Sequence, residues 1–146
     1  MYFIYCNGHY LNHNKIPNDP FHRSSVSCSE SKSITNHLWN INEDNSIHGL
    51  NGENIISNHI GWMSERSNIL LLGEHDYDLI IYPLKMIYNL GKIYTIINEI
   101  KYLLIKDSNN NILIMRDKGV EDKLISDKWE IKKYNSQWKI KIMDED

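Results

Sequence analysis

At 146 residues the chain has the length of one domain and is too short for two ordinary domains, so we expect a single core in residues 1–146. The net charge is −3 and the lysines alternate with acids, which excludes the broad positive field that general nucleic-acid or anionic-membrane binding needs. No run approaches the roughly 20 apolar residues that span a bilayer, so we expect neither a nucleic-acid partner nor membrane insertion.

The apolar residues favour strands over helices. Isoleucine and tyrosine dominate, Val26 and Val120 are the only valines, and alanine is absent. The same bias is typical of drift in an AT-rich genome, which weakens arguments from composition. The first residues lack a basic region followed by an apolar one, so we expect a cytoplasmic, non-secreted protein. Cys6 and Cys28 are then expected to be reduced thiols without a disulfide.

The predicted elements recur three times along the chain. Residues 4–11, 56–63 and 96–103 each carry an Ile six positions before an aromatic–aliphatic pair. A candidate strand follows in each copy, at residues 25–30, 69–73 and 112–115. Each copy then has an aromatic and an aliphatic residue two positions apart, which places both on one strand face. These pairs are Trp39 and Ile41, Tyr82 and Leu84, and Trp129 and Ile131.

Turn residues separate these elements, at Asn7-Gly8, Asn51-Gly52 and residues 109–111. The pattern predicts an all-β fold of about twelve short strands in three divergent four-strand repeats, residues 1–53, 54–91 and 92–146. One such unit cannot bury its apolar face alone, whereas three can close a sheet around a common axis. The aromatic residues of the repeated pairs should then lie in the core or in the hairpins that cap it. They are Tyr10, Trp39, Trp62, Tyr82, Tyr102 and Trp129.

Two segments complicate this pattern. Residues 84–106 also show helical spacing of apolar positions, which would give an α+β fold. We favour strands because Gly91 interrupts the run and β-branched and aromatic residues fill it. Residues 137–142 alternate cleanly and predict one strand more, pairing with residues 2–5.

The threefold pattern resembles the β-trefoil superfamily, which includes ricin-type lectins, fibroblast growth factors and Kunitz-type protease inhibitors. The resemblance covers nearly the whole chain at the level of the fold. Residues 3–11, Phe-Ile-Tyr-Cys-Asn-Gly-His-Tyr-Leu, look like the first hairpin of a growth-factor trefoil. The resemblance implies a β-trefoil that binds a ligand without catalysing a reaction.

The densest polar cluster is expected on a loop between two strands. It offers carboxylates, an imidazole and an aromatic ring, the groups that hold sugar hydroxyls or a cation. The cluster is residues 74–78, and together with Trp62, whose ring would stack on a sugar, it gives the predicted carbohydrate-binding residues. They are Trp62, Glu74, His75, Asp76 and Asp78.

A protein ligand is the alternative. Residues 12–33 form a long loop that Pro17 and Pro20 would stiffen, as an inhibitor needs. The chain would then be a protease inhibitor, a cytokine-like ligand or a cytoskeletal-binding protein that uses this loop. Long loops in compact domains tend to be either functional or disordered.

Catalysis and metal binding have weaker support. No motif of a known catalytic site is present, so we expect no enzyme and no cofactor. Cys6, His9 and His13 have the spacing of half a zinc site, but no second cysteine pair follows. Cys28 with His22 or His37 as base would be the one nucleophile to consider.

Overall fold

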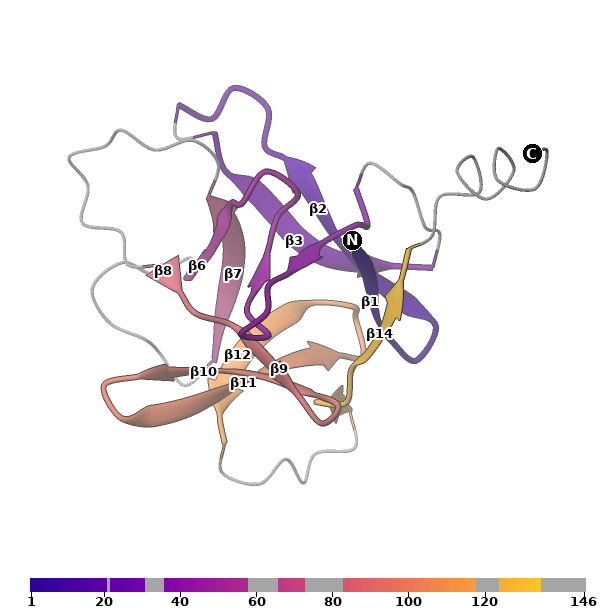
Figure 1. Ribbon diagram of the computed structural model, residues 1–146, viewed down its shortest axis with the longest axis vertical. Coiled ribbons are helices and arrows are strands. Elements are labelled where there is room, and N and C mark those ends of the chain that lie inside the picture. The colour runs from indigo at the N-terminus through magenta and orange to yellow at the C-terminus, as the bar shows by residue number, and fades with distance from the viewer. Residues whose placement is uncertain (21, 31–35, 58–65, 73–82, 118–123, 135–146) are drawn as a thin grey trace.

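The protein is all-β in a computed structural model that describes residues 1–20, 22–30, 36–57, 66–72, 83–117 and 124–134 (Figure 1). The described residues contain no helix, and so none long and apolar enough to cross a membrane. The first seven strands are β1 (Tyr2–Cys6), β2 (His9–Lys15), β3 (Ser24–Ser29), β4 (Asn40–Ile41), β5 (Ile47–His48), β6 (Asn54–Ser57) and β7 (Arg66–Leu72). The others are β8 (Pro83–Leu84), β9 (Ile87–Asn89), β10 (Lys92–Ile97), β11 (Ile100–Asp107), β12 (Ile112–Arg116), β13 (Ile125–Ser126) and β14 (Glu130–Lys133).

The strands pair antiparallel in one long path. Its order is β14-β1-β2-β3-β7-β12-β11-β10-β9, and β4 and β5 form a separate pair. The two ends of the path meet, because the Trp129 N–H donates to the Gly91 carbonyl at 2.6 Å, beside the β9–β10 turn. The sheet therefore curls back on itself and brings β14 beside both β1 and the β9–β10 hairpin (Figure 1).

Three hairpins turn on two residues, as the Asn7-Gly8 pair predicts for the first. The turns are Asn7–Gly8, Leu90–Gly91 and Asn98–Glu99, and all six residues have φ between 48° and 82°. Positive φ at both central positions matches the right-handed twist of the flanking strands. Leu90 and Glu99 adopt it despite their side chains.

The turns correct the predicted alignment of the first and third copies by one residue. Asn7 and Asn98 occupy the same turn position, so Leu11 corresponds to Tyr102, which the sequence pattern had aligned with Tyr10. Leu11 and Tyr102 are both buried in the core, whereas Tyr10 is half-buried outside it. A shift of one residue moves a side chain to the other face of a strand.

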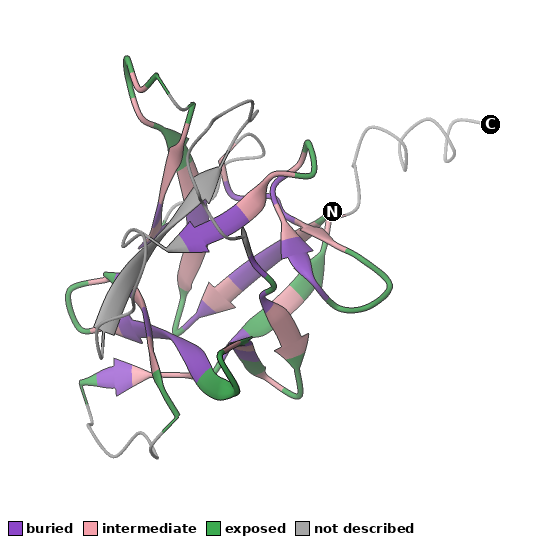
Figure 2. Cartoon of the chain, turned by 90° about the vertical axis from the view of Figure 1, so that its left-hand side faces the viewer, coloured by how far each residue is buried: buried purple, intermediate pink, exposed green. Residues whose placement is uncertain are grey.

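The core lies inside the curled sheet and draws on strands from both ends of the chain (Figure 2). Trp39 and Trp129 are fully buried there, as expected. Their indole N–H groups donate to backbone carbonyls of the second strand of a hairpin, Trp39 to Leu11 at 3.0 Å and Trp129 to Leu104 at 2.9 Å. Trp62 and Tyr82 lie outside the described residues.

The helical alternative for residues 84–106 is wrong. This segment forms β9, β10 and most of β11, because Gly91 turns the chain at a φ of 82°. In β10, Ile93 and Thr95 are buried and Ile96 is exposed, which is the alternation of a strand.

The strands predicted at residues 25–30 and 112–115 are confirmed with small changes of boundary, as β3 and β12. Residues 69–73 fall largely within β7. The extra strand predicted at residues 137–142 lies outside the described residues. Its expected place beside residues 2–5 is taken by β14, which pairs Tyr2 with Lys133 and Tyr5 with Glu130.

Candidate functional site

The residues predicted to bind carbohydrate lie outside the described part of the chain. They are Trp62, Glu74, His75, Asp76 and Asp78. Their role stays a prediction.

The predicted loop at residues 12–33 is mostly a hairpin. β2 extends to Lys15 and β3 begins at Ser24, and the Ile16 N–H donates to the Arg23 carbonyl at 3.0 Å. The Asp19 carboxylate, 4% exposed, accepts from the Arg23 N–H at 2.8 Å and from its guanidinium at 2.9 and 3.2 Å. Such a two-pronged pair fixes the hairpin tip at the upper end of Figure 1. The exposed residues of the tip are Pro17, Asn18, Pro20 and His22.

The outward side of this hairpin carries a network of uncharged polar side chains. Side chains alternate along β2, and Leu11 points into the core. Tyr10, Asn12 and Asn14 therefore point away from the core. Asn12 Nδ2 donates to Ser29 Oγ at 3.1 Å. Asn12 Oδ1 accepts from Ser27 Oγ at 2.6 Å and from Asn14 Nδ2 at 3.1 Å. The two bonds with Ser27 and Ser29 cross from β2 to β3, and together with the bond from Asn14 they hold the amide of Asn12 in one orientation.

His37 extends the network from the segment that follows β3. Its Nε2 lies 2.8 Å from Ser29 Oγ, and the ring is 5% exposed. The same ring stands edge-on to Tyr10, with centroids 6.3 Å apart. His37 therefore joins the polar network to an aromatic cluster.

The aromatic cluster covers the outward side of β1, β2 and β14. Tyr10 contacts Tyr5 and Phe3 at ring-centroid distances of 5.6 and 5.8 Å, and Phe3 contacts Tyr134 at 5.8 Å. Phe3 is buried beneath its neighbours, whereas the tyrosines are half-buried. The outer surface of β14, β1, β2 and β3 thus presents ring surface next to amide and hydroxyl groups.

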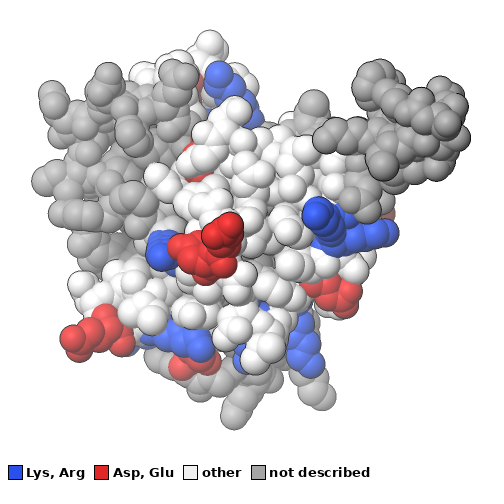
Figure 3. Space-filling model, in the orientation of Figure 1, with Lys and Arg blue, Asp and Glu red and all other residues white. Residues whose placement is uncertain are grey.

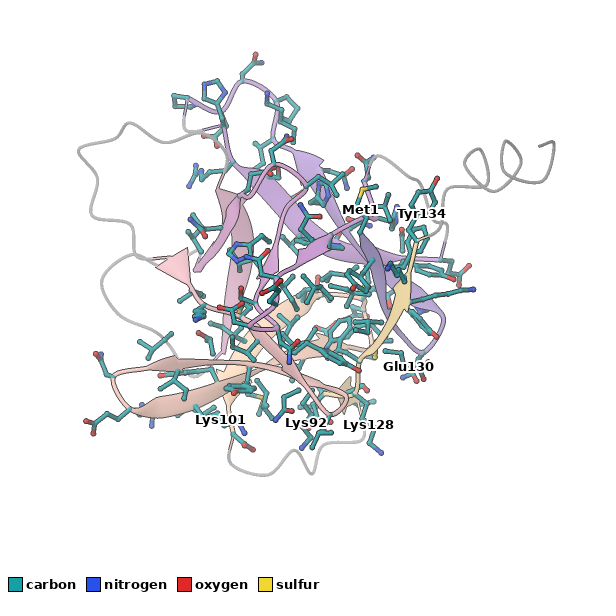
Figure 4. The ribbon with its side chains drawn as sticks, in the orientation of Figure 1. Met1, Lys92, Lys101, Lys128, Glu130 and Tyr134 are labelled. Carbon is teal, nitrogen blue, oxygen red and sulfur yellow. The ribbon has the colours of Figure 1, made fainter. Side chains whose placement is uncertain are left out.

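Charged groups border the aromatic cluster on the β14 side. The hydrogen bond of Tyr5 with Glu130 raises the pKa of the Tyr5 phenol. Figure 4 shows Glu130 and Tyr134 toward the two ends of β14, and Lys132 is the cross-strand neighbour of Phe3. Over the described surface in Figure 3, acidic and basic side chains are interspersed without forming one large field.

Cys6, His9 and His13 do not come together as a metal site. Cys6 is buried in the core, and the His9 imidazole lies 3.7 Å from the Glu30 carboxylate and 3.1 Å from the Asn7 carbonyl. His13 bonds to the Leu38 carbonyl and packs edge-on against Trp39. In the described ranges no group of three His, Cys, Asp or Glu residues is placed to hold a metal ion.

Cys28 is a buried free thiol, as is Cys6. Burial raises the pKa of Cys28 to about 12, with a further rise from Cys6 and an opposing effect of Lys106. The thiol is therefore protonated near neutral pH and is not an activated nucleophile. Of its two suggested bases, His37 is engaged with Ser29, and His22 is exposed at the hairpin tip.

A second polar chain lies around β5. Ser46 Oγ donates to Asp44 Oδ1 at 2.5 Å, and this bond, with the Ser46 N–H and Lys85, holds the pKa of Asp44 well below its usual range. The hydroxyl hydrogen is thus committed, so His48 Nε2 must carry the hydrogen of its 3.0 Å bond to Ser46 Oγ. His48 Nδ1 is buried and has no partner in the described structure.

No family model, curated protein or solved structure matches this chain. Candidate site residues are therefore identified from the structure of this chain alone.

The sequence does carry a signal for the outer face that was not recognised. Tyr10, Asn12 and Asn14 alternate along one strand, and Ser25, Ser27 and Ser29 alternate along the next. Period-two polar residues in paired strands indicate one shared face. The pairing of Asn12 with Ser27 and of Tyr10 with Ser29 brings them together.

Proposed function

We propose that the chain is a non-catalytic binding module of the β-trefoil type and that its ligand is a carbohydrate. The trefoil is supported by two hairpins with the same two-residue turn, β1–β2 and β10–β11. It is also supported by Trp39 and Trp129, whose indoles each donate to a carbonyl of the second strand of such a hairpin, and by β14 closing the sheet against β1.

The outer face of β1, β2 and β3 carries the carbohydrate proposal. Sugars are recognised by aromatic rings together with hydroxyl and amide groups that can donate and accept hydrogen bonds. Half-buried Tyr5 and Tyr10 lie beside Asn12, Asn14 and the hydroxyls of β3. The predicted loop residues, Trp62 and those between 74 and 78, would provide a second contact area.

A glycan array of the purified full chain tests this function. Far-UV circular dichroism of the same sample establishes that the protein is folded and β-rich. Binding of a defined glycan would support the proposal. Silence from a folded protein, at high density of immobilised glycans, would contradict it.

A protein ligand is the second candidate, and the clamp between Asp19 and Arg23 favours it. A tip fixed in the free protein loses little entropy when it docks. Replacing residues 17–22 by Asn-Gly should leave the fold intact and abolish binding of a protein partner. A partner retained equally by this variant and by the wild type would refute the use of the hairpin tip.

A further inference from the structure

We propose that the outer face of the β2–β3 hairpin binds a neutral oligosaccharide, with a sugar ring on Tyr10 and hydroxyl groups on Asn14. This inference rests on the proposed carbohydrate function and names its site and its class of ligand. We call the site the saccharide face and define it as Tyr5, Tyr10, Asn14, Ser25 and Ser27.

The fold does not require polar residues at this face. The shared turn position of Asn7 and Asn98 makes Asn12 and Asn14 correspond to Leu103 and Ile105 in β11. There the outward side is apolar and packs into a small second cluster with Ile125 of β13. The β2–β3 hairpin instead holds amides and hydroxyls at the same places, so the fold does not impose the polarity of this face.

The polar network leaves hydrogen-bonding capacity directed at solvent. Asn12 is 4% exposed and its side-chain amide is hydrogen-bonded to Asn14, Ser27 and Ser29, whereas Asn14 is exposed. Asn14 Nδ2 has two hydrogens, and one of them is donated to Asn12. The second hydrogen and the amide oxygen can pair with adjacent sugar hydroxyls. The half-buried Ser27 hydroxyl donates to Asn12 and can still accept a hydrogen bond.

The tyrosines supply a stacking surface at the other end of the face. Tyr5 and Tyr10 are cross-strand partners with ring centroids 5.6 Å apart and an interplanar angle of 43°. Both are half-buried, so part of each ring is accessible. A ring that is held by neighbours loses little freedom when a sugar packs on it. The rings therefore form a preorganised platform.

Charge and length define the ligand further. The saccharide face itself contains no Lys, Arg, Asp or Glu, and Glu130 of the neighbouring β14 is engaged with Tyr5. Lys15 follows Asn14 on β2 but alternates to the other side of the strand, so an acidic sugar would find no cation among the residues of this face. Tyr10 and Asn14 are four residues apart on one strand, or roughly 14 Å at about 3.4 Å per residue. A ligand that contacts both is longer than a single sugar ring.

Affinity measurements on four variants test the site. The test variants are Tyr10→Leu and Asn14→Ala. The matched controls are Tyr94→Leu, also half-buried in a hairpin, and Asn89→Ala, also exposed at the end of a strand. Each protein is titrated with the glycan that gives the strongest array signal for the wild type. Loss of one well-placed contact should raise Kd at least about fivefold in the test variants, and the controls should stay within about twofold.

The outcomes separate this inference from the function on which it rests. If the folded wild type binds no glycan, both fail. If it binds a glycan with an affinity that Asn14→Ala leaves unchanged, while Trp62→Ala or Asp76→Ala abolishes it, the saccharide face is refuted and carbohydrate binding stands. Asn14 is exposed, so its variant folds even if Tyr10→Leu does not. Strong selection of anionic glycans would also overturn the neutral-ligand assignment.

Discussion

Replacing Trp39 or Trp129 by Phe should destabilise the protein by about the same amount. Each indole is buried, at 0% and 1% exposure, and donates one hydrogen bond to a backbone carbonyl. Losing that bond costs about 1 kcal/mol. The smaller ring leaves a void of roughly 40 Å³, which at about 24 cal/mol per Å³ costs about another 1 kcal/mol. We therefore expect each variant to lose about 2 kcal/mol of unfolding free energy.

Urea unfolding followed by far-UV circular dichroism measures this loss without relying on tryptophan fluorescence. Tyr88→Phe is the control, because it removes only a long bond of 3.4 Å from a half-buried hydroxyl to the Trp129 carbonyl. It should change stability by less than about 0.5 kcal/mol. A loss of about 2 kcal/mol in one tryptophan variant and none in the other would refute their equivalent roles.

Three further predictions concern single side chains. Asp19→Asn should cost about 1–2 kcal/mol in urea unfolding, because it removes the charge-assisted pair with Arg23; an unchanged midpoint would show that the tip is not clamped. Cys28 should react with a disulfide reagent about a thousandfold more slowly than a free thiol at pH 8, until urea unfolds the chain; rapid labelling of both native cysteines would contradict its burial. Burial tends to raise the pKa of Asp107, but hydrogen bonds from Asn111 and the Asn109 N–H outweigh it and lower the pKa. The ionised Asp107 carboxylate then stabilises the protein above its ordinary pKa near 3.8, and this stabilisation is lost as the pH falls through the lowered pKa. Asp107→Asn should therefore lower the unfolding free energy at pH 6 and much less at pH 2. An equal loss at both pH values would exclude the ionised carboxylate as the cause.

Local signals in the sequence predicted much of the fold. Asn7-Gly8 marked a hairpin because few residues adopt positive φ easily, and the alternation in β3 and the apolar run of β12 are typical of strands. The buried tryptophans followed from their pairing with an aliphatic residue two positions later. These features depend on neighbours in sequence and can be read without knowing the fold.

Features that depend on pairing between distant segments could not be predicted in the same way. The alignment of the first and third copies missed by one residue, because two similar tyrosines stand on opposite faces of their strands. The Asp19–Arg23 pair looked like part of a long loop, since only the backbone geometry reveals that it closes a hairpin. The saccharide face depends on the register of β1, β2 and β3, which the sequence alone does not give, whereas the polar residues at 74–78 are contiguous and stand out in the sequence.

The outer face also shows that corresponding strand positions in this protein can be either apolar or polar. Leu103 and Ile105 pack into a buried apolar cluster at the β10–β11 hairpin, and Asn12 and Asn14 take the corresponding positions in β2. Folds of this kind host unrelated functions on different surfaces. The contrast between corresponding positions within one chain is therefore more informative here than the fold itself.

One glycan array, probed in parallel with the wild type and with Asn14→Ala, tests most directly whether this is a carbohydrate-binding module that uses its β2–β3 face. We expect the wild type to bind at least one neutral oligosaccharide and the variant to lose that signal while keeping its circular dichroism spectrum. Absence of binding by the folded wild type would contradict the carbohydrate function, and identical binding by both proteins would contradict the site.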